Sequence, residues 1–364
     1  MGKVIRVGMD TSKSVFQLHG VDENEMPVLR RQLRRHQVLA FFAQLPATVI
    51  GMEACGAAFY WARQLKALGH EVVLIPPQYV KAYVARGKND AADAEAICEA
   101  MSRPKIKKRF VPIKTLDQQA AQMLIGARQA LQRRRTQVSN AIRGYAAEFG
   151  VVVAKGVAQI EPLLERLGKD QAIPALAREM FVVLAGQYRH ANAQLVEIEA
   201  KLKAFHRSNE LSRRLAEVPV IGPVTATAMV AKVTAPKMFG SGRNFSAWIG
   251  LTPKDHSTAG RFKLGVITRA GDEMLRALLV NGATAVIQHV MRRLKAGKTA
   301  DISPWLLALM RRKPPKLAAV ALANKAARIA WKLMVSGERY DPHKATALQQ
   351  CLSASLADSL EAAA

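Results

Sequence analysis

The sequence predicts a mixed α/β domain at the N-terminus, followed by mainly helical domains. Short apolar runs bounded by turn residues occur throughout residues 4–103. Two long segments, 115–149 and 157–205, are rich in Ala, Gln, Arg and Leu and have a helical period, and further helical segments follow residue 211. Short strands that alternate with helices indicate a sheet covered by helices, whereas long helical periods indicate helices that pack without a sheet.

Five short apolar runs are the expected strands of the N-terminal sheet. They are Val4–Met9, Val15–Val21, Met26–Gln32, Ala47–Met52 and Glu71–Ile75. The first three follow one another through short turns, which predicts a meander. The last two are separated by the helical run Phe59–Leu68, and another helix is expected over Asp90–Ser102.

The pattern divides the chain into four regions. We expect an α/β domain over 1–103, a helical spacer over 104–210, a mainly helical domain over 211–344 and a flexible tail over 345–364. The spacer has the pattern of an antiparallel helical hairpin or coiled-coil arm. The polar stretch Thr252–Gly271 is too long to be only a connector.

The charge of the chain predicts a polyanionic partner. Its 364 residues include 54 Lys and Arg against 28 Asp and Glu, which gives a formal net charge of +26, and half of them are apolar, which excludes wholesale disorder. Nucleic acid is the first candidate partner and an acidic membrane surface the second. No stretch of 18 apolar residues predicts a membrane span, and three scattered cysteines favour a reducing cytosol over a disulfide framework.

Four carboxylates stand where a sheet and a helix can bring them together. Asp10 ends the first strand, Glu53 follows the fourth, and Asp90 and Asp93 share one face at the start of a helix. Hard divalent cations such as Mg²⁺ bind oxygen ligands of this kind. Each acid alone reads more simply as a turn, capping or surface residue. Their placement in one α/β domain of an acid-poor chain favours a metal site.

These residues carry a resemblance to a known family. The segments VGMDTSK, IGMEACG and GKNDAADAEAI, in that order, resemble the D, E and D-x-x-D motifs of DEDD transposases of bacterial insertion sequences. The resemblance implies a ribonuclease-H-like domain, similar to RuvC-type Holliday-junction resolvases. It also implies that Asp10, Glu53, Asp90 and Asp93 are catalytic and hold Mg²⁺ or Mn²⁺.

A serine in the C-terminal polar stretch is the candidate nucleophile. The run GLTPKDHSTAG, followed by GVITRAG, is similar to the block of the same transposase family in which a serine is the proposed nucleophile. We assign this role to Ser257. The family loop commonly reads HSSGG where this chain has HSTAG, so the register leaves Thr258 as an alternative. The β-branch of Thr258 restricts its hydroxyl and makes it the poorer choice.

Basic and turn residues complete the candidate site. The turn at Gly222 resembles a helix-hairpin-helix element that grips a phosphate backbone, although an ordinary turn between two helices explains it nearly as well. Basic runs are usually solvated helix faces, but their number here favours a nucleic-acid track. The candidate nucleic-acid contacts are Lys13, Lys88, Arg133, Arg134, Arg135, Gly222, Lys254, Arg261, Lys263 and Arg269.

The leading hypothesis is a DNA transposase or recombinase. The family resemblance implies element-end and target DNA, a structured non-coding (bridge) RNA as guide, a homo-oligomer (dimer or tetramer), and a bacterial cytoplasmic, nucleoid-associated location without a membrane. One alternative is a hydrolytic junction-resolvase-like nuclease that uses only the carboxylates and water. The other is a non-catalytic nucleic-acid-binding protein.

Overall fold

The structure is a computed structural model that describes residues 3–84, 90–107, 109–258, 260–261, 263–297 and 303–342, without the side chain of Asp90. It divides into two compact units, Met1–Leu116 and Asp117–Ala364, here the N-terminal and C-terminal units. Lys88 and the predicted tail 345–364 lie outside the described residues.

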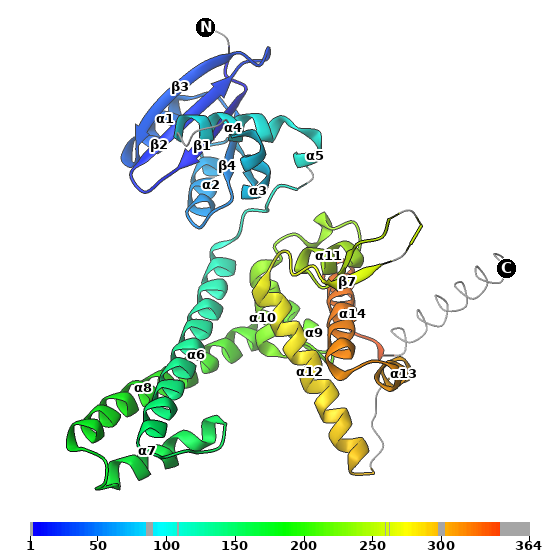
Figure 1. The fold of residues 1–364 in the computed structure, drawn as a ribbon. Helices are drawn as coiled ribbons and strands as arrows, with labels where there is room; N and C mark the ends of the chain where they lie inside the picture. Colours follow the sequence, from blue (N-terminus) through cyan, green and yellow to red (C-terminus); the bar gives the residue numbers. More distant parts are fainter. Residues whose placement is uncertain are drawn as a thin grey trace, which may run out of the picture. The chain divides into compact units, whose positions relative to one another are not determined.

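The N-terminal unit is built on a five-stranded mixed sheet in the order β3-β2-β1-β4-β5 (Figure 1). β1 pairs antiparallel with β2, and β2 with β3, so the predicted meander is confirmed. β4 is parallel to β1, and β5 to β4. The strands are β1 Arg6–Thr11, β2 Val15–Val21, β3 Pro27–Arg34, β4 Val49–Glu53 and β5 Glu71–Ile75.

Helices cover both faces of this sheet. On one face, α1 (Val38–Gln44) and α2 (Ala58–Ala67) enclose a core with Met9 and Met52 of the strands. On the other face, α4 (Asp90–Ser102) packs on Val73 and Ile75 of β5. The sequence pattern did not predict α1. The remaining short elements are α3 Pro77–Val80, α5 Pro104–Lys107, η1 Arg35–Gln37 and η2 Lys81–Tyr83.

Two glycines let α4 lie against the sheet. Gly8 of β1 and Gly51 of β4 are register partners on neighbouring strands. A Cβ atom at Gly8 would lie 2.6 Å from the backbone nitrogen of Cys98, and closer still to the carbonyl oxygen of Ala94. A Cβ atom at Gly51 would lie 2.7 Å from Sδ of Met101. The backbone of α4 therefore occupies the space that a side chain at Gly8 would fill, and side chains of α4 occupy that space at Gly51.

The C-terminal unit begins with a helical arm. Its helices are α6 Leu116–Glu148, α7 Ile160–Lys169 and α8 Ala175–Ser208, with η3 Val157–Gln159 before α7. Arg128 of α6 pairs with Glu199 of α8, and Arg135 donates to Asn192, so the two helices run antiparallel as predicted. Ile142, Leu163 and Tyr188 belong to one small core that joins all three helices.

The rest of the C-terminal unit is mainly helical, with one two-stranded hairpin. Its elements are α9 Glu210–Leu215, α10 Pro223–Lys232, η4 Pro236–Met238, α11 Gly242–Ile249, β6 Pro253–Asp255, β7 Leu264–Ile267, α12 Glu273–Lys295, α13 Pro304–Arg312 and α14 Pro315–Ser336. The larger core of the unit contains residues of α10, α11, α12 and α14. Figure 1 shows how these helices are arranged. The hairpin lies within the predicted polar stretch, where no strands were expected.

Within the part of the chain that the structure describes, one helix, α12, is long and apolar enough to cross a membrane by length and composition alone. Leu275, Leu279, Ala283 and Ile287 recur every fourth residue along α12 and are buried in the core of the C-terminal unit. A core helix of this kind passes the same length and composition test, so the criterion is weak support for a membrane span.

We predict that Gly8→Ala destabilises the N-terminal unit by about 1–3 kcal/mol, because overpacking a tight contact has this typical cost. Hydrogen exchange measured by mass spectrometry should become faster in β1 and α4. Gly56→Ala is the matched control, since a Cβ atom there has no neighbour within 4 Å. Unchanged exchange in the Gly8→Ala protein would contradict the tight helix–sheet contact.

Candidate functional site

Asp10 and Glu53 lie on the sheet face that α4 covers. Side chains alternate between the two faces of a strand, and Met9 and Met52 point into the core on the opposite face. Asp10 and Glu53 therefore share the face of Gly8 and Gly51, two residues before them. Because β1 and β4 are parallel and in register, both carboxylates lie at the same edge of the sheet.

The first turn of α4 lies at this same edge. Gly8 faces Ala94 and Cys98, while Arg6, earlier on β1, interacts with Cys98, later on α4. The helix therefore runs opposite to β1, and its N-terminal turn is nearest the end of the strand. This direction brings Asp93 toward the carboxylate edge. The backbone of Asp90 begins α4.

Glu53 and Asp93 interact electrostatically. Burial raises the pKa of Glu53, and the negative charge of Asp93 raises it further. Both side chains are half-buried, as is Asp10. Two carboxylates brought together in a partly dry environment disfavour the ionised state of each other unless a cation joins them.

The donor chemistry of this edge fits a hard divalent cation. Asp10, Glu53 and Asp93 offer only oxygen ligands, which Mg²⁺ and Mn²⁺ prefer. Among the side chains that the structure describes, no group of three or more His, Cys, Asp or Glu is close enough to hold a metal ion. The structure thus brings Glu53 and Asp93 into interaction and places Asp10 on the same face.

Ser257 lies on the exposed hairpin between β6 and β7. Its backbone N–H donates to Oδ1 of Asp255 at 2.8 Å, and its Oγ accepts from the backbone N–H of Lys263 at 3.1 Å. Hydrogen bonds from Ser257 lower the pKa of Asp255, and His256 acts in the same direction. The serine hydroxyl is therefore held in place while its side chain stays open to solvent.

The neighbouring Thr258 has a different part in the hairpin. Its backbone exchanges two hydrogen bonds with Arg261, at 3.3 Å and 2.9 Å, and these close the tip of the hairpin. The left-handed φ of 76° at Gly260 allows this tight reversal. The backbone of Thr258 thus shapes the loop, whereas Ser257 presents a positioned hydroxyl.

Four of the predicted nucleic-acid contacts are on or beside this hairpin. Lys254, Arg261, Lys263 and Arg269 are all exposed. Arg269 has a φ of 55°, in the left-handed region, and its backbone N–H donates to the carbonyl of Gly250. The hairpin therefore presents basic side chains around Ser257.

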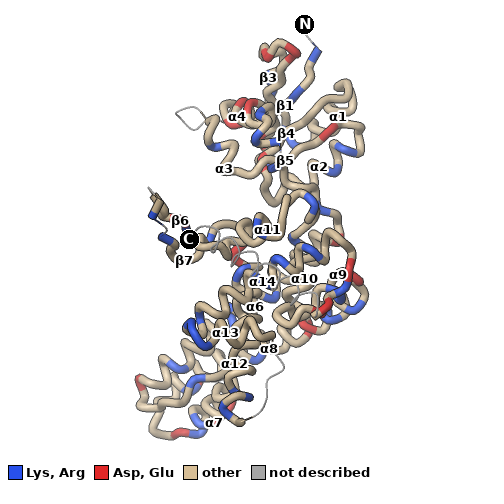
Figure 2. The backbone as a smooth tube through the Cα atoms, turned by 90° about the vertical axis from the view of Figure 1, so that its right-hand side faces the viewer, with Lys and Arg blue, Asp and Glu red and all other residues tan. Residues whose placement is uncertain are grey.

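The other predicted contacts that the structure describes are distributed over both units, and Figure 2 shows Lys and Arg throughout the described residues. Lys13 is exposed in the turn between β1 and β2. Arg133 and Arg134 are exposed on α6, whereas Arg135 is half-buried and bonded to Asn192. Gly222 is the N-cap of α10, and no atom lies within 4 Å of where its Cβ would be.

Sequence reasoning missed three residues that build these sites. Gly8 and Gly51 place α4, and each precedes its carboxylate in the repeated pattern G-M-acid, which was visible in VGMD and IGME. Asp255 fixes the backbone of Ser257. The order Asp-x-Ser was also visible, since an Asp side chain commonly accepts from the N–H two residues later.

Comparison with known proteins places both sites in transposase sequences. A DEDD-type profile described as "Transposase" matches residues 7–149, and a profile described as "Transposase IS116/IS110/IS902 family" matches residues 212–297. The chain is 58% identical to the transposase y4pF/y4sB of Sinorhizobium fredii, over 93% of this chain and 86% of that protein. It is 45% identical to a family 20 transposase of Pseudomonas aeruginosa, over 93% of this chain and 98% of that protein. It is 36% identical to the transposase for insertion sequence element IS1328 of Yersinia enterocolitica, over 93% and 98% respectively.

We predict that Asp93→Asn lowers the pKa of Glu53, because the mutation removes the neighbouring negative charge. ¹³C NMR titration of labelled Glu in EDTA measures this shift, with Glu53→Gln to assign the signal. A raised folded-state pKa means that folding favours protonated Glu53, so its contribution to stability is present at low pH and is lost as pH rises through that pKa. Asp93→Asn should therefore reduce the loss of folding stability that accompanies the ionisation of Glu53.

Glu95→Gln is the matched control, because Glu95 is on the same helix but does not contribute to the shift of Glu53. It should leave the Glu53 titration unchanged. If Glu53 titrated with the same midpoint in Asp93→Asn and in the wild type, the two carboxylates would not interact.

Proposed function

The chain belongs to the IS116/IS110/IS902 family of transposases, which are DNA strand-transfer enzymes, and we propose that it performs this reaction with a carboxylate-bound metal and a serine nucleophile. The observation that carries the first half is the shared sheet edge of Asp10, Glu53 and Asp93. The observation that carries the second is the positioned, exposed hydroxyl of Ser257.

The proposed metal ligands are Asp10, Glu53, Asp90 and Asp93. The effect of Asp93 on the pKa of Glu53 supports this set, because a cation relieves the repulsion between adjacent carboxylates. Mg²⁺ or Mn²⁺, when bound, supplies charge stabilisation to the attacking and leaving oxygens of a phosphodiester. The tight contact of α4 with the sheet supports a place for Asp93 beside Asp10, the second-last residue of β1, and Glu53, the last residue of β4.

Ser257 is the proposed nucleophile. Its Oγ gives its proton to water and forms a bond to phosphorus. The bond from phosphorus to the leaving strand oxygen breaks, and that oxygen takes up a proton to become a hydroxyl, so the phosphodiester is conserved as a phosphoserine link. A strand oxygen then replaces the serine without net hydrolysis. Exposed Lys254, Arg261 and Lys263 are placed to hold phosphate oxygens during these steps.

We also propose the finer features that the family resemblance implies. The strand order β3-β2-β1-β4-β5 supports a ribonuclease-H-like, RuvC-like N-terminal domain. The turn at Gly222 supports a helix-hairpin-helix-like grip on a phosphate backbone. The antiparallel pair α6 and α8 supports a coiled-coil spacer, and exposed Leu176, Val182 and Val196 on α8 support a dimer or tetramer.

A guide RNA is part of the proposal. The family resemblance implies this RNA, and base pairing to it would supply the sequence selection that backbone contacts do not provide. The proposed partners are therefore element-end DNA, target DNA and a structured bridge RNA, and the proposed location is the bacterial cytoplasm in association with the nucleoid.

We predict that Ser257→Ala lowers strand exchange by about 10³-fold or more, because it removes the attacking oxygen. Asp10→Asn should do the same through the metal site. The direct measurement uses nicked suicide DNA, on which wild type should accumulate a covalent protein–DNA adduct and Ser257→Ala should not.

Thr258→Ala is the control that separates the two hydroxyls, and it should retain exchange within a few-fold. Adduct formation by Ser257→Ala but not by Thr258→Ala would transfer the nucleophile role to Thr258. Efficient cleavage without any adduct would favour a hydrolytic nuclease instead.

We predict that the arm contacts a phosphate backbone through Arg133 and Arg134. Replacing both with Ala should reduce the slope of log affinity against log salt by about 1.4 to 1.8, since each phosphate contact contributes about 0.7 to 0.9. Fluorescence anisotropy across a salt series measures this slope. Arg189→Ala is the control, because Arg189 is an arm arginine engaged by Glu161 at 2.8 Å. An unchanged slope in the double variant would place the nucleic acid elsewhere.

A further inference from the structure

The N-terminal unit contains a pocket beside the carboxylate edge, on the face covered by α4. Its volume is about 390 Å³, which is within the range of small-ligand sites. β2, β3 and the first turns of α4 form its walls. The side chains that line it include Gln17, His19, Arg30, Gln32, Ala92 and Glu95.

Strand register connects this pocket to Asp10. Asp10 pairs with Gln17 across β1 and β2, and Gln17 pairs with Gln32 across β2 and β3. Directly paired side chains lie on the same face, and neighbouring strands are about 4.8 Å apart. The amide of Gln17 therefore lies about one strand spacing from Asp10, and the amide of Gln32 about two. The three side chains form a row across the sheet that begins at Asp10.

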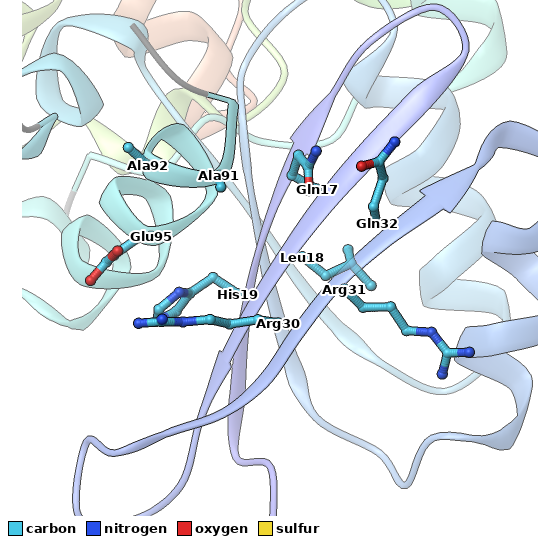
Figure 3. A pocket seen from close by; sticks show the side chains of 9 residues that line it. All are labelled: Gln17, Leu18, His19, Arg30, Arg31, Gln32, Ala91, Ala92 and Glu95. Carbon is cyan, nitrogen blue, oxygen red and sulfur yellow. The ribbon is translucent and has the colours of Figure 1, made fainter. Parts of the chain in front are cut away.

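The polar groups of the pocket form two sets (Figure 3). Gln17 and Gln32 project next to each other at one end, and His19 and Arg30 lie together at the other. Glu95 faces the second set from α4. The small side chain of Ala92 leaves the space between helix and sheet open.

His19 is a neutral hydrogen-bonding group in this wall. Its side chain is only 6% exposed. Burial lowers the pKa of His19, and Arg30 acts in the same direction while Glu95 opposes both. A buried neutral imidazole has one N–H donor and one acceptor, so it matches a polar ligand.

The lining chemistry matches a nucleobase with its phosphate. A glutamine amide offers a donor and an acceptor side by side, which is the pattern that reads a base edge. The Arg30 guanidinium is suited to phosphate oxygens, and the Glu95 carboxylate to an exocyclic amino group. No part of the proposed metal and serine chemistry uses these residues.

We propose that this pocket binds one unstacked nucleobase of the DNA strand next to the scissile phosphate, with Gln17 and Gln32 on the base edge and Arg30 on its phosphate. This inference rests on the proposed function, because Asp10 marks where the scissile phosphate lies. A strand that passes over Asp10 and continues along the row reaches the pocket within one or two nucleotides.

Photo-crosslinking of the full-length chain to element-end DNA tests the proposal. Each base near the cleavage position is replaced in turn by 5-iodo-2′-deoxyuridine, and the crosslinked peptide is identified after irradiation in EDTA. We expect one or two adjacent positions to crosslink to residues 17–19 or 30–32. Gln17→Leu/Gln32→Leu should lower that yield about tenfold, as the loss of one base contact predicts.

Gln44→Leu is the matched control, because Gln44 is an exposed glutamine of α1, on the opposite side of the sheet. It should crosslink as wild type does. Crosslinks that map only outside the pocket, or equal yields from the double variant and wild type, would overturn the proposal. Crosslinking only from 5-iodouridine in the non-coding RNA would overturn the assignment to DNA.

A double-mutant cycle adds a second readout. An abasic site at the crosslinked position and the Gln17→Leu/Gln32→Leu change should each lower strand exchange about tenfold, and together lower it no further. If the abasic site and the double variant together lowered strand exchange by the product of their separate effects, the proposal would be overturned. Crosslinking in EDTA requires no cleavage, so normal activity of Asp10→Asn would refute the metal site while leaving the pocket result readable.

Discussion

The close contact of α4 with the glycines of β1 and β4 is the constraint on which the N-terminal site depends. Gly8 makes room for the backbone of α4, and Gly51 makes room for the Met101 side chain of the same helix. This contact sets both the height of α4 above the strands and the position of its first turn. On each of these strands, the glycine that contacts α4 and the candidate metal-binding acid are two residues apart and lie on one face.

The two proposed halves of the reaction depend on different kinds of structure. Asp10, Glu53 and Asp93 come from three elements, and they share one end of the sheet only when the sheet and α4 have packed. Ser257 is instead held by bonds within one hairpin, from its own N–H to Asp255 and from Lys263 to its hydroxyl. The first site is thus a product of tertiary packing, and the second of local backbone geometry.

Much of the fold was predictable because its elements follow simple periods. Strand-end acids and a D-x-x-D helix start made Asp10, Glu53, Asp90 and Asp93 candidates without knowledge of any contact. The pocket was not predictable in this way, because Gln17 and Gln32 become neighbours only through the register of β2 and β3. The β6–β7 hairpin was missed for a related reason, since its exposed strands bury no apolar face and leave no alternating pattern.

The antiparallel register of the arm limits how this protein can change in length. From Arg128 to Arg135 along α6, the partner on α8 moves back from Glu199 to Asn192. At the base, Ile125 and Leu202 enter the core of the C-terminal unit, and Tyr188 belongs to the core at the tip. An insertion in α6 alone would shift every pair beyond it. The arm can therefore become longer or shorter only through compensating changes in both helices, so we expect its length to stay constant among related chains.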